Sequence, residues 1–504
     1  MGDKGATGEV PVDTVDFGSM LDRDIWGYFP VKLVPGITGL AAIVILTRNL
    51  EPEEYGTYSV VIATVLLIVQ MFGTWLSNAV LYVYPDYQNK NDRAFLHHTF
   101  KLQGIAASVA VLFGYTAILL ITHNHLLGLI GALIIVAQLF QSLMTTFLQS
   151  TRRVGGQAVS VIVQSLAQLG VLCGLIYLVK GKEEAALSAV LAGYISCIPV
   201  LLFQTFALSR KKLTGNDLAV GHLFGKLLSY GMPMCMWFFA TQFYTIGDRI
   251  LLKLIGSTTG LGEYASFRDL ATGGAGFLTM PILMASHPII MAMWKRGIER
   301  SLIEQLMTRN LVILTILFVP IFVAVDLCGP ELIMGLLGGK YLLPKPTMLL
   351  VVGSIFLGSV TMYVQKGLEV TGRTLQMSKL ALVAAIISLF GNVVLIPNYG
   401  VRGAAMMVVV VQLLYLTFVW YATKGTLRAT IPIRFVGKLA LWAIGVELVC
   451  RLLEGVSGPL GSFLGSRFVR VIVLVGATCA LYAANDRVSS VGKAIIRAFK
   501  RAKQ

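Results

Sequence analysis

Charged side chains are scarce in this sequence of 504 residues. Asp, Glu, Lys and Arg together make up 13% of it, which is about half of their share in an ordinary soluble domain. Apolar residues make up 56%, and the mean hydropathy is +0.77. This composition excludes a water-soluble enzyme, a disordered chain and a nucleic-acid-binding domain, although the net charge of +16 alone would suggest the last of these. It is typical of a membrane protein with many spans, whose Lys and Arg residues gather on one face.

Motifs for disulfide, metal or nucleotide chemistry are also missing. The six cysteines lie far apart and form no CxxC pair, so we expect neither a disulfide framework nor a metal site. The phosphate-binding pattern GxxxxGKS/T does not occur, which disfavours ATP-driven transport by this chain alone. The first segment of about 25 residues is acidic and polar, so we expect no cleaved signal peptide. No bound cofactor is expected.

Long apolar runs fill most of the chain. A helix needs about 20 apolar residues to cross a bilayer, and charges, Gly, Pro and Asn divide this chain into about fourteen runs of that length. The loops between them are short, so no soluble domain is expected. We expect helices at 26–48, 57–83, 100–121, 126–150, 157–179, 185–208, 228–253, 264–293, 309–328, 346–366, 376–397, 402–423, 435–453 and 468–485.

Lys and Arg are unevenly distributed among the loops. If the N-terminus is cytoplasmic, most of the 41 Lys and Arg residues fall in inner segments, whereas the first outer loop is acidic. The positive-inside rule therefore predicts a multi-pass protein of the cytoplasmic (inner) membrane with both termini inside. The expected organisation is a cytoplasmic tail (1–25), an N-lobe of six helices (26–210), a cytoplasmic linker (211–227), a C-lobe of six helices (228–424), helices thirteen and fourteen (425–486) and a basic cytoplasmic tail (487–504).

A short motif occurs twice. Gly56-Thr-Tyr58 opens the second predicted helix and Gly262-Glu-Tyr264 opens the eighth, each after an outer turn. If each lobe has six helices and begins on the cytoplasmic side, the two lobes are related by an axis along the membrane normal, as in transporters with alternating access. The alternative is a large helical bundle in which the repeat reflects only duplication.

Four segments, in the same order, resemble the polysaccharide-biosynthesis or oligosaccharide flippase family of the multidrug/oligosaccharidyl-lipid/polysaccharide (MOP) exporter superfamily. The resemblance spans predicted helices one to twelve. It is carried by Val34–Gly39 with Leu46–Tyr58, by Asp248–Gly256 with Gly262–Tyr264, by Gly372–Arg373, and by Gly391–Ala405.

The resemblance implies an all-helical, V-shaped, MATE-like fold of two lobes, which moves a lipid-linked sugar across the membrane. The headgroup would pass through a central, often cationic cavity while the lipid tail stays among the membrane lipids. Polysaccharide polymerases or glycosyltransferases are the implied partners, and we expect a monomer that binds no nucleic acid. The two additional helices resemble the fourteen-helix members, which include the lipid II flippases. The driving force stays open: a coupling ion (H⁺ or Na⁺), the membrane potential and downstream consumption of the polymer are the alternatives.

Charges inside predicted helices are expensive and are therefore candidates for the transport site. Lys32 lies in the first helix and would bind a diphosphate as a point charge, or reach the inner interface with its amine. Asp248 and Arg249 lie near the outer end of helix seven, and Arg268 and Asp269 near the outer start of helix eight. These four either pair as a structural cluster or form an anion-binding or gating patch at the outer mouth.

Amide side chains form the second set of candidates. Gln70 and Asn78 belong to the second helix and Gln242 to the seventh. They would hydrogen-bond sugar hydroxyls in a wet cavity or join neighbouring helices. We expect a net cationic or neutral cavity lined by helices one, two, seven and eight.

Two other functions compete with a flippase. A multidrug exporter of the same superfamily, coupled to a cation, is the first, although fourteen helices and the motifs favour a sugar-lipid substrate. A membrane glycosyltransferase or polymerase is the second, because Glu51 and Glu53 superficially match its acidic pair. Their loop is too short to hold an acceptor, so the chain is not expected to be an enzyme.

Overall fold

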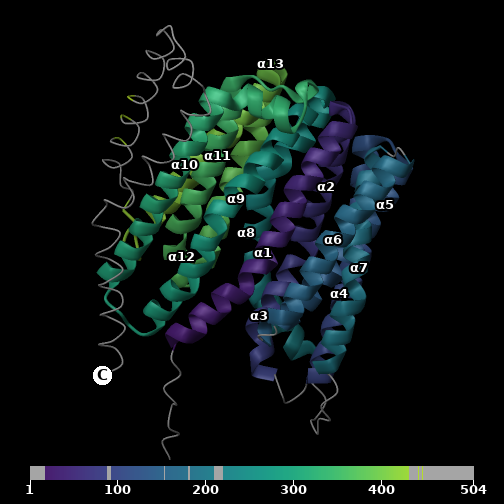
Figure 1. Cartoon of the computed structure of the whole chain (residues 1–504). Coiled ribbons are helices and arrows are strands. Elements are labelled where there is room, and N and C mark those ends of the chain that lie inside the picture. The colour runs from purple at the N-terminus through teal and green to yellow at the C-terminus, as the bar shows by residue number, and fades with distance from the viewer. Residues whose placement is uncertain are drawn as a thin grey trace, which may run out of the picture.

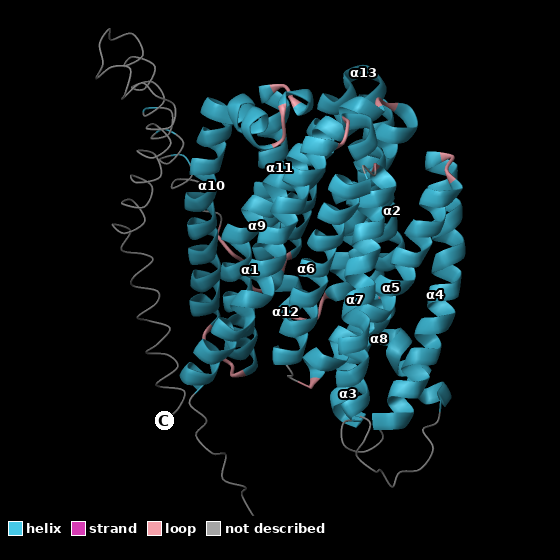
Figure 2. Cartoon of the chain, turned by 45° about the vertical axis from the view of Figure 1, so that its right-hand side comes forward, coloured by secondary structure: helices cyan, strands magenta, loops and turns pink. Residues whose placement is uncertain are grey.

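The computed structural model describes residues 17–87, 92–151, 154–179, 182–208 and 220–430, together with the single positions 437, 441 and 445. All regular structure in these residues is helical (Figures 1 and 2). By length and composition, eight of the described helices are long and apolar enough to cross a membrane. The chain is therefore a multi-pass membrane protein. Predicted helices thirteen and fourteen lie outside the described residues, apart from the three single positions.

The N-terminal half contains seven helices in the described residues. They are α1 (Phe17–Asn49), α2 (Pro52–Phe72), α3 (Thr74–Tyr87), α4 (Asp92–Thr122), α5 (His125–Ser150), α6 (Val154–Val179) and α7 (Glu183–Leu208). The predicted second helix is the pair α2 and α3, which meet at Gly73. The other five correspond to predicted helices one and three to six.

The C-terminal half contains longer helices. They are α8 (Val220–Ile255), α9 (Thr258–Lys295), α10 (Arg300–Leu336), the short 3-10 helix η1 (Gly339–Tyr341), α11 (Lys345–Val364), α12 (Lys366–Val370) and α13 (Thr374–Ala422).

Predicted helices eleven and twelve both lie within α13, which consists of two helices separated by the non-helical backbone of Gly400. Gly400 has φ 56° and ψ −134°, a backbone conformation that a glycine adopts without the steric cost of a Cβ. The motif Gly391–Ala405 therefore contains the bend that separates the last two spans of this half.

Each half is held together by neighbouring helices. In the N-terminal half α5 packs against α4 and α7, and α6 packs against α1 and α7. In the C-terminal half α13 packs against α8 and α11, and α10 packs against α11. Figure 1 shows the blue helices α4 to α7 on one side and the green helices α10 and α11 on the other.

The interface between the halves is formed by α1, α2 and α3 on one side and by α8 and α9 on the other. At the predicted outer end, the Lys340 amine lies 3.1 Å from a Glu51 carboxylate oxygen, and the Tyr341 hydroxyl donates to the Leu50 carbonyl at 2.9 Å. Towards the other end, the Cys235 thiol of α8 donates to the Met71 carbonyl of α2 at 3.1 Å. The halves therefore touch along most of α2.

Candidate functional site

The four charged residues predicted in helices seven and eight form two ion pairs between α8 and α9. We call Asp248, Arg249, Arg268 and Asp269 the outer cluster. Arg249 contacts Asp269 at 2.5 Å, and Arg268 contacts Asp248 at 2.5 Å. The Asp248 and Arg268 side chains are 1% and 5% exposed. Each cation therefore has its own anion, and the charges of the cluster cancel.

The outer cluster also binds the N-terminal half. The Tyr55 hydroxyl of α2 donates to Asp269 at 3.0 Å, and the Arg249 guanidinium donates to the Ser59 hydroxyl at 2.8 Å. Within the C-terminal half, the Tyr264 hydroxyl donates to Asp248 at 2.6 Å. Buried ion pairs of this kind stabilise a structure only when further hydrogen bonds satisfy the remaining polar atoms. Here some of those hydrogen bonds come from the opposite half, so the cluster fastens α2 to the hairpin of α8 and α9.

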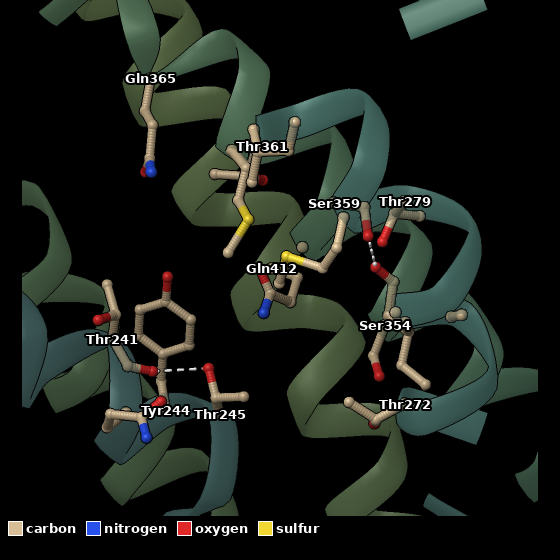
Figure 3. Close-up of a pocket in the computed structure, with 18 of the residues that line it drawn as sticks. Thr241, Tyr244, Thr245, Thr272, Thr279, Ser354, Ser359, Thr361, Gln365 and Gln412 are labelled. Carbon is tan, nitrogen blue, oxygen red and sulfur yellow. Dashed lines mark hydrogen bonds between the residues drawn. The ribbon is translucent and has the colours of Figure 1, made fainter. Parts of the chain in front are cut away.

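A pocket of about 390 Å³ lies beside the cluster (Figure 3). It is lined by α8, α9, α11 and α13, and α2 contributes one residue, Gln70. This volume is within the range of cavities that bind small molecules. Its polar lining residues are Gln70, Thr241, Gln242, Thr245, Thr272, Thr279, Ser354, Ser359, Thr361, Gln365 and Gln412.

The hydroxyl groups in the pocket are oriented by their own helices. Five of them donate their proton to a carbonyl oxygen about one turn earlier, at 2.6 to 2.9 Å. A hydroxyl whose proton is used in this way still offers lone pairs to a ligand. The five are Thr241, Thr245, Ser354, Ser359 and Thr361.

Gln412 is a buried amide residue in the wall of the pocket. It lies in an apolar run of α13 and is 6% exposed. Its amide makes no hydrogen bond to any described residue, and Figure 3 shows it pointing into the space between α8 and α11. A buried amide without a partner costs free energy, so a ligand or water in the pocket is the natural partner for it.

Aromatic side chains complete the wall on the side of α8. Trp237, Phe238 and Tyr244 line the pocket. The Trp237 indole donates to the Tyr415 hydroxyl at 2.9 Å, and the Tyr244 and Tyr415 rings lie 5.5 Å apart. These contacts hold the aromatic surface in a fixed orientation.

Among the described residues that line the pocket, Arg268 is the one that carries a charge. Its guanidinium also donates to the Tyr264 hydroxyl at 2.7 Å and to the Thr245 carbonyl. Because Asp248 neutralises it, the pocket carries no excess charge.

The other predicted site residues are divided between the pocket and local contacts. Gln70 and Gln242 line the pocket, and Gln70 accepts a hydrogen bond from Thr74 at 2.6 Å. Asn78 is not among the lining residues and donates to the Thr74 carbonyl of its own helix at 2.8 Å. The side chain of Lys32 lies outside the described residues.

The lining differs from the prediction in two respects. The pocket is lined by predicted helices two, seven and eight, but also by ten and twelve, and no described residue of α1 lines it. Gln412 and the hydroxyl groups of α8 and α11 were not among the predicted site residues. Gln412 could have been found in the sequence because it is the one Gln in the apolar run of residues 408–416. The hydroxyl groups of α8 could have been found because Thr241 and Thr245 lie one helical turn apart, next to Gln242.

Metal chemistry has no support in the described part of the chain. No group of three or more His, Cys, Asp or Glu residues there is arranged to hold a metal ion, and the four described cysteines form no disulfide.

The profile of the polysaccharide biosynthesis protein family matches residues 27–294, which is more than half of the chain. The chain belongs to this family. A curated relative, an uncharacterised membrane protein of Methanocaldococcus jannaschii, is 25% identical over 250 residues. That match covers 48% of this chain and 46% of the relative, so the chain spans about half the length of the curated relative that it matches.

Solved structures of lipid and drug transporters have a similar fold. The lipid II flippase MurJ in an inward closed conformation matches with a TM-score of 0.71 at 12% identity, over 90% of this chain and 97% of MurJ. An inward-facing MATE multidrug resistance transporter of the MOP superfamily matches with a TM-score of 0.62 at 12% identity, over 81% of this chain and 98% of that transporter. A Vibrio cholerae MATE transporter matches with a TM-score of 0.55 at 13% identity, over 81% of this chain and 97% of its own.

Family and fold agree with the resemblance of the four sequence segments. The chain is a multi-pass membrane protein of the polysaccharide biosynthesis protein family, with the all-helical, MATE-like architecture predicted from the sequence.

Proposed function

We propose that this protein is a flippase, which moves a lipid-linked oligosaccharide or polysaccharide precursor across the cytoplasmic membrane. The pocket beside the interface between the halves is the observation that carries this proposal. It combines hydroxyl groups, amides and aromatic rings, which are the groups that recognise sugars, and none of its described lining residues is acidic. The family match and the likeness of the fold to MurJ support a lipid-linked sugar as the substrate.

Alternating access would use the two halves as lobes, at residues 26–210 and 228–424. The hydrogen bonds of Tyr55 and Ser59 of α2 with the outer cluster join these lobes at the predicted outer end. Separation of the two lobes at this end would expose the pocket to the outside. In this proposal both termini are cytoplasmic, the protein works as a monomer, and glycosyltransferases and a polymerase supply and consume its substrate.

The fold of the multidrug transporters suggests a second candidate function, the export of a cationic drug. A buried cation needs a nearby anion, but the described lining residues of the pocket include neither Asp nor Glu. Asp248 contacts the lining residue Arg268, and its carboxylate is neutralised by that contact. The pocket therefore favours a sugar-lipid over a cationic drug.

Catalysis by the acidic residues of the first outer loop has less support. Glu51 caps α2 in a reciprocal capping box with Glu54 and pairs with Lys340. Glu53 accepts a hydrogen bond from Thr259 at 2.8 Å. Both carboxylates thus hold the interface together.

Transport into liposomes tests the proposal. Purified protein would be reconstituted with a fluorescent oligosaccharide linked to polyprenyl diphosphate, and an impermeant quencher would report the fraction that changes leaflet. We expect protein-dependent movement of this lipid and none of a cationic dye such as ethidium, with protein-free liposomes as the control. Movement of the dye alone would overturn the proposal in favour of a drug exporter.

A further inference from the structure

We propose that the pocket in the C-terminal half binds an uncharged sugar residue of the transported headgroup, and that the diphosphate binds elsewhere. This inference rests on the proposed flippase function and names the part of the substrate that this pocket recognises. Charge, hydrogen-bonding capacity and shape each lead to it.

The charge of the pocket argues against a phosphate. Arg268 is the one cation among the lining residues that the structure describes, and its guanidinium is held at 2.5 Å by Asp248, whose side chain is 1% exposed. A phosphate in this place would be buried next to a cation that is already neutralised. Burial of such an unpaired anion is strongly unfavourable. An uncharged ligand avoids this cost.

The hydrogen-bonding groups fit a ligand that both donates and accepts. The five hydroxyls that donate to their own helices, those of Thr241, Thr245, Ser354, Ser359 and Thr361, leave lone pairs for a ligand. Phosphate oxygens, which only accept, would face these lone pairs without a proton between them. Each sugar hydroxyl has one proton to donate and lone pairs to accept.

The Gln412 amide supplies the matching donor and acceptor in one side chain. It is 6% exposed, has no hydrogen-bonding partner among the described residues, and points into the pocket in Figure 3. A site with a buried amide of this kind discriminates strongly against ligands that leave the amide unpaired. We therefore assign Gln412 as a specificity residue for the sugar.

The size and the apolar wall agree with a sugar ring. A volume of about 390 Å³ lies at the lower end of the range of small-molecule cavities, which agrees with a ligand of the size of a sugar residue. Trp237 and Tyr244 present rigid aromatic surface at the same side of the pocket, and such surface packs against the apolar C–H face of a sugar ring.

Two variants and one matched control test the inference. Gln412→Met keeps the volume of the side chain and removes the amide, while Thr245→Val keeps the shape and removes the hydroxyl. Thr417→Val is the control, because Thr417 lies on the same helix as Gln412, is exposed, and donates to the Leu413 carbonyl at 2.7 Å without lining the pocket. Each protein would be studied in nanodiscs, with thermal unfolding to verify that it is folded.

The readout is binding of two probes that share a tail, pentyl glucoside and pentyl phosphate, measured by microscale thermophoresis. We expect Gln412→Met and Thr245→Val each to weaken binding of the glucoside about three- to tenfold, and to leave binding of the phosphate and the control variant unchanged. Equal weakening of both probes, or no change for the glucoside in either variant, would overturn the inference.

The proposed function is tested separately by the wild-type protein in liposomes. If the wild-type protein moves the lipid-linked oligosaccharide but neither substitution changes the affinity for the glucoside, the flippase proposal stands and the assignment of the pocket is wrong. If wild-type protein moves no lipid-linked sugar, the flippase proposal fails whatever the binding result.

Discussion

Gly56 of α2 and Gly262 of α9 lie in contact across the interface between the two halves. A Cβ at Gly262 would stand 1.7 Å from the Pro52 carbonyl oxygen, and a Cβ at Gly56 would stand 2.7 Å from the Thr258 carbonyl oxygen. Such distances leave no room for any side chain, so the two helices meet backbone to backbone. The two copies of the Gly-x-Tyr motif thus form the two sides of one contact.

Gly262→Ala is expected to force α2 and α9 apart at this point. Because the neighbouring atoms belong to the backbone, the methyl group cannot be accommodated by rotation of a side chain, and overpacking of this kind costs about 1–3 kcal/mol. A lower midpoint of thermal unfolding in detergent would report the loss. Gly274→Ala on the same helix is the control, since a Cβ there meets no heavy atom within 4 Å. Equal midpoints for the two variants would contradict the close contact.

Tyr55→Phe removes the hydrogen bond from α2 to Asp269. The Asp269 carboxylate then keeps its pair with Arg249 but loses a donor from the other half, and a hydrogen bond to a charged group contributes about 1.5–3 kcal/mol. We expect a lower unfolding midpoint and faster hydrogen exchange at the start of α2. Tyr58→Phe serves as the control, because the Tyr58 hydroxyl has no hydrogen bond to a described residue. The same change in both variants would show that ring packing and not the hydrogen bond is responsible.

Asp248→Asn tests the charge balance of the pocket. The substitution keeps the shape of the side chain and leaves Arg268 buried without an anion, which destabilises a protein by about 3–5 kcal/mol. It also makes the pocket cationic, so binding of pentyl phosphate should increase while the unfolding midpoint falls. The double variant with Arg268→Gln is expected to recover part of the stability and to lose the gained affinity. An Asp248→Asn protein with wild-type phosphate binding would contradict the role of this pair.

The orientation in the membrane is tested by labelling single cysteines in a background without the six native ones. Ser257→Cys, between α8 and α9, is predicted to react with an impermeant maleimide added outside the cell. Glu299→Cys, between α9 and α10, is predicted to react only after the membrane is permeabilised. Both positions are exposed. The opposite pattern would place both termini outside.

The candidate site was only partly predictable. Gln70, Gln242 and Arg268 were identified because polar groups stand out in apolar helices, and all three line the pocket. That Arg268 would be neutralised by Asp248 was one of two alternatives, because spacing along two helices does not fix which side chains face each other. Gln412 was missed because its importance depends on α8 and α11, which are distant in sequence but surround it in the fold.

The sequence by itself determined the class of the protein, the positions of its long apolar helices in the described residues and the family. These properties depend on local composition, on runs of apolar residues and on short motifs, all of which are readable along the chain. The tertiary structure decided the pairing of the outer cluster, the contact of Gly56 with Gly262 and the position of the pocket in the C-terminal half. The physical reason is that ion pairs, close backbone contacts and cavities arise from residues brought together by the packing of helices, and hydropathy carries no information about which helix faces which.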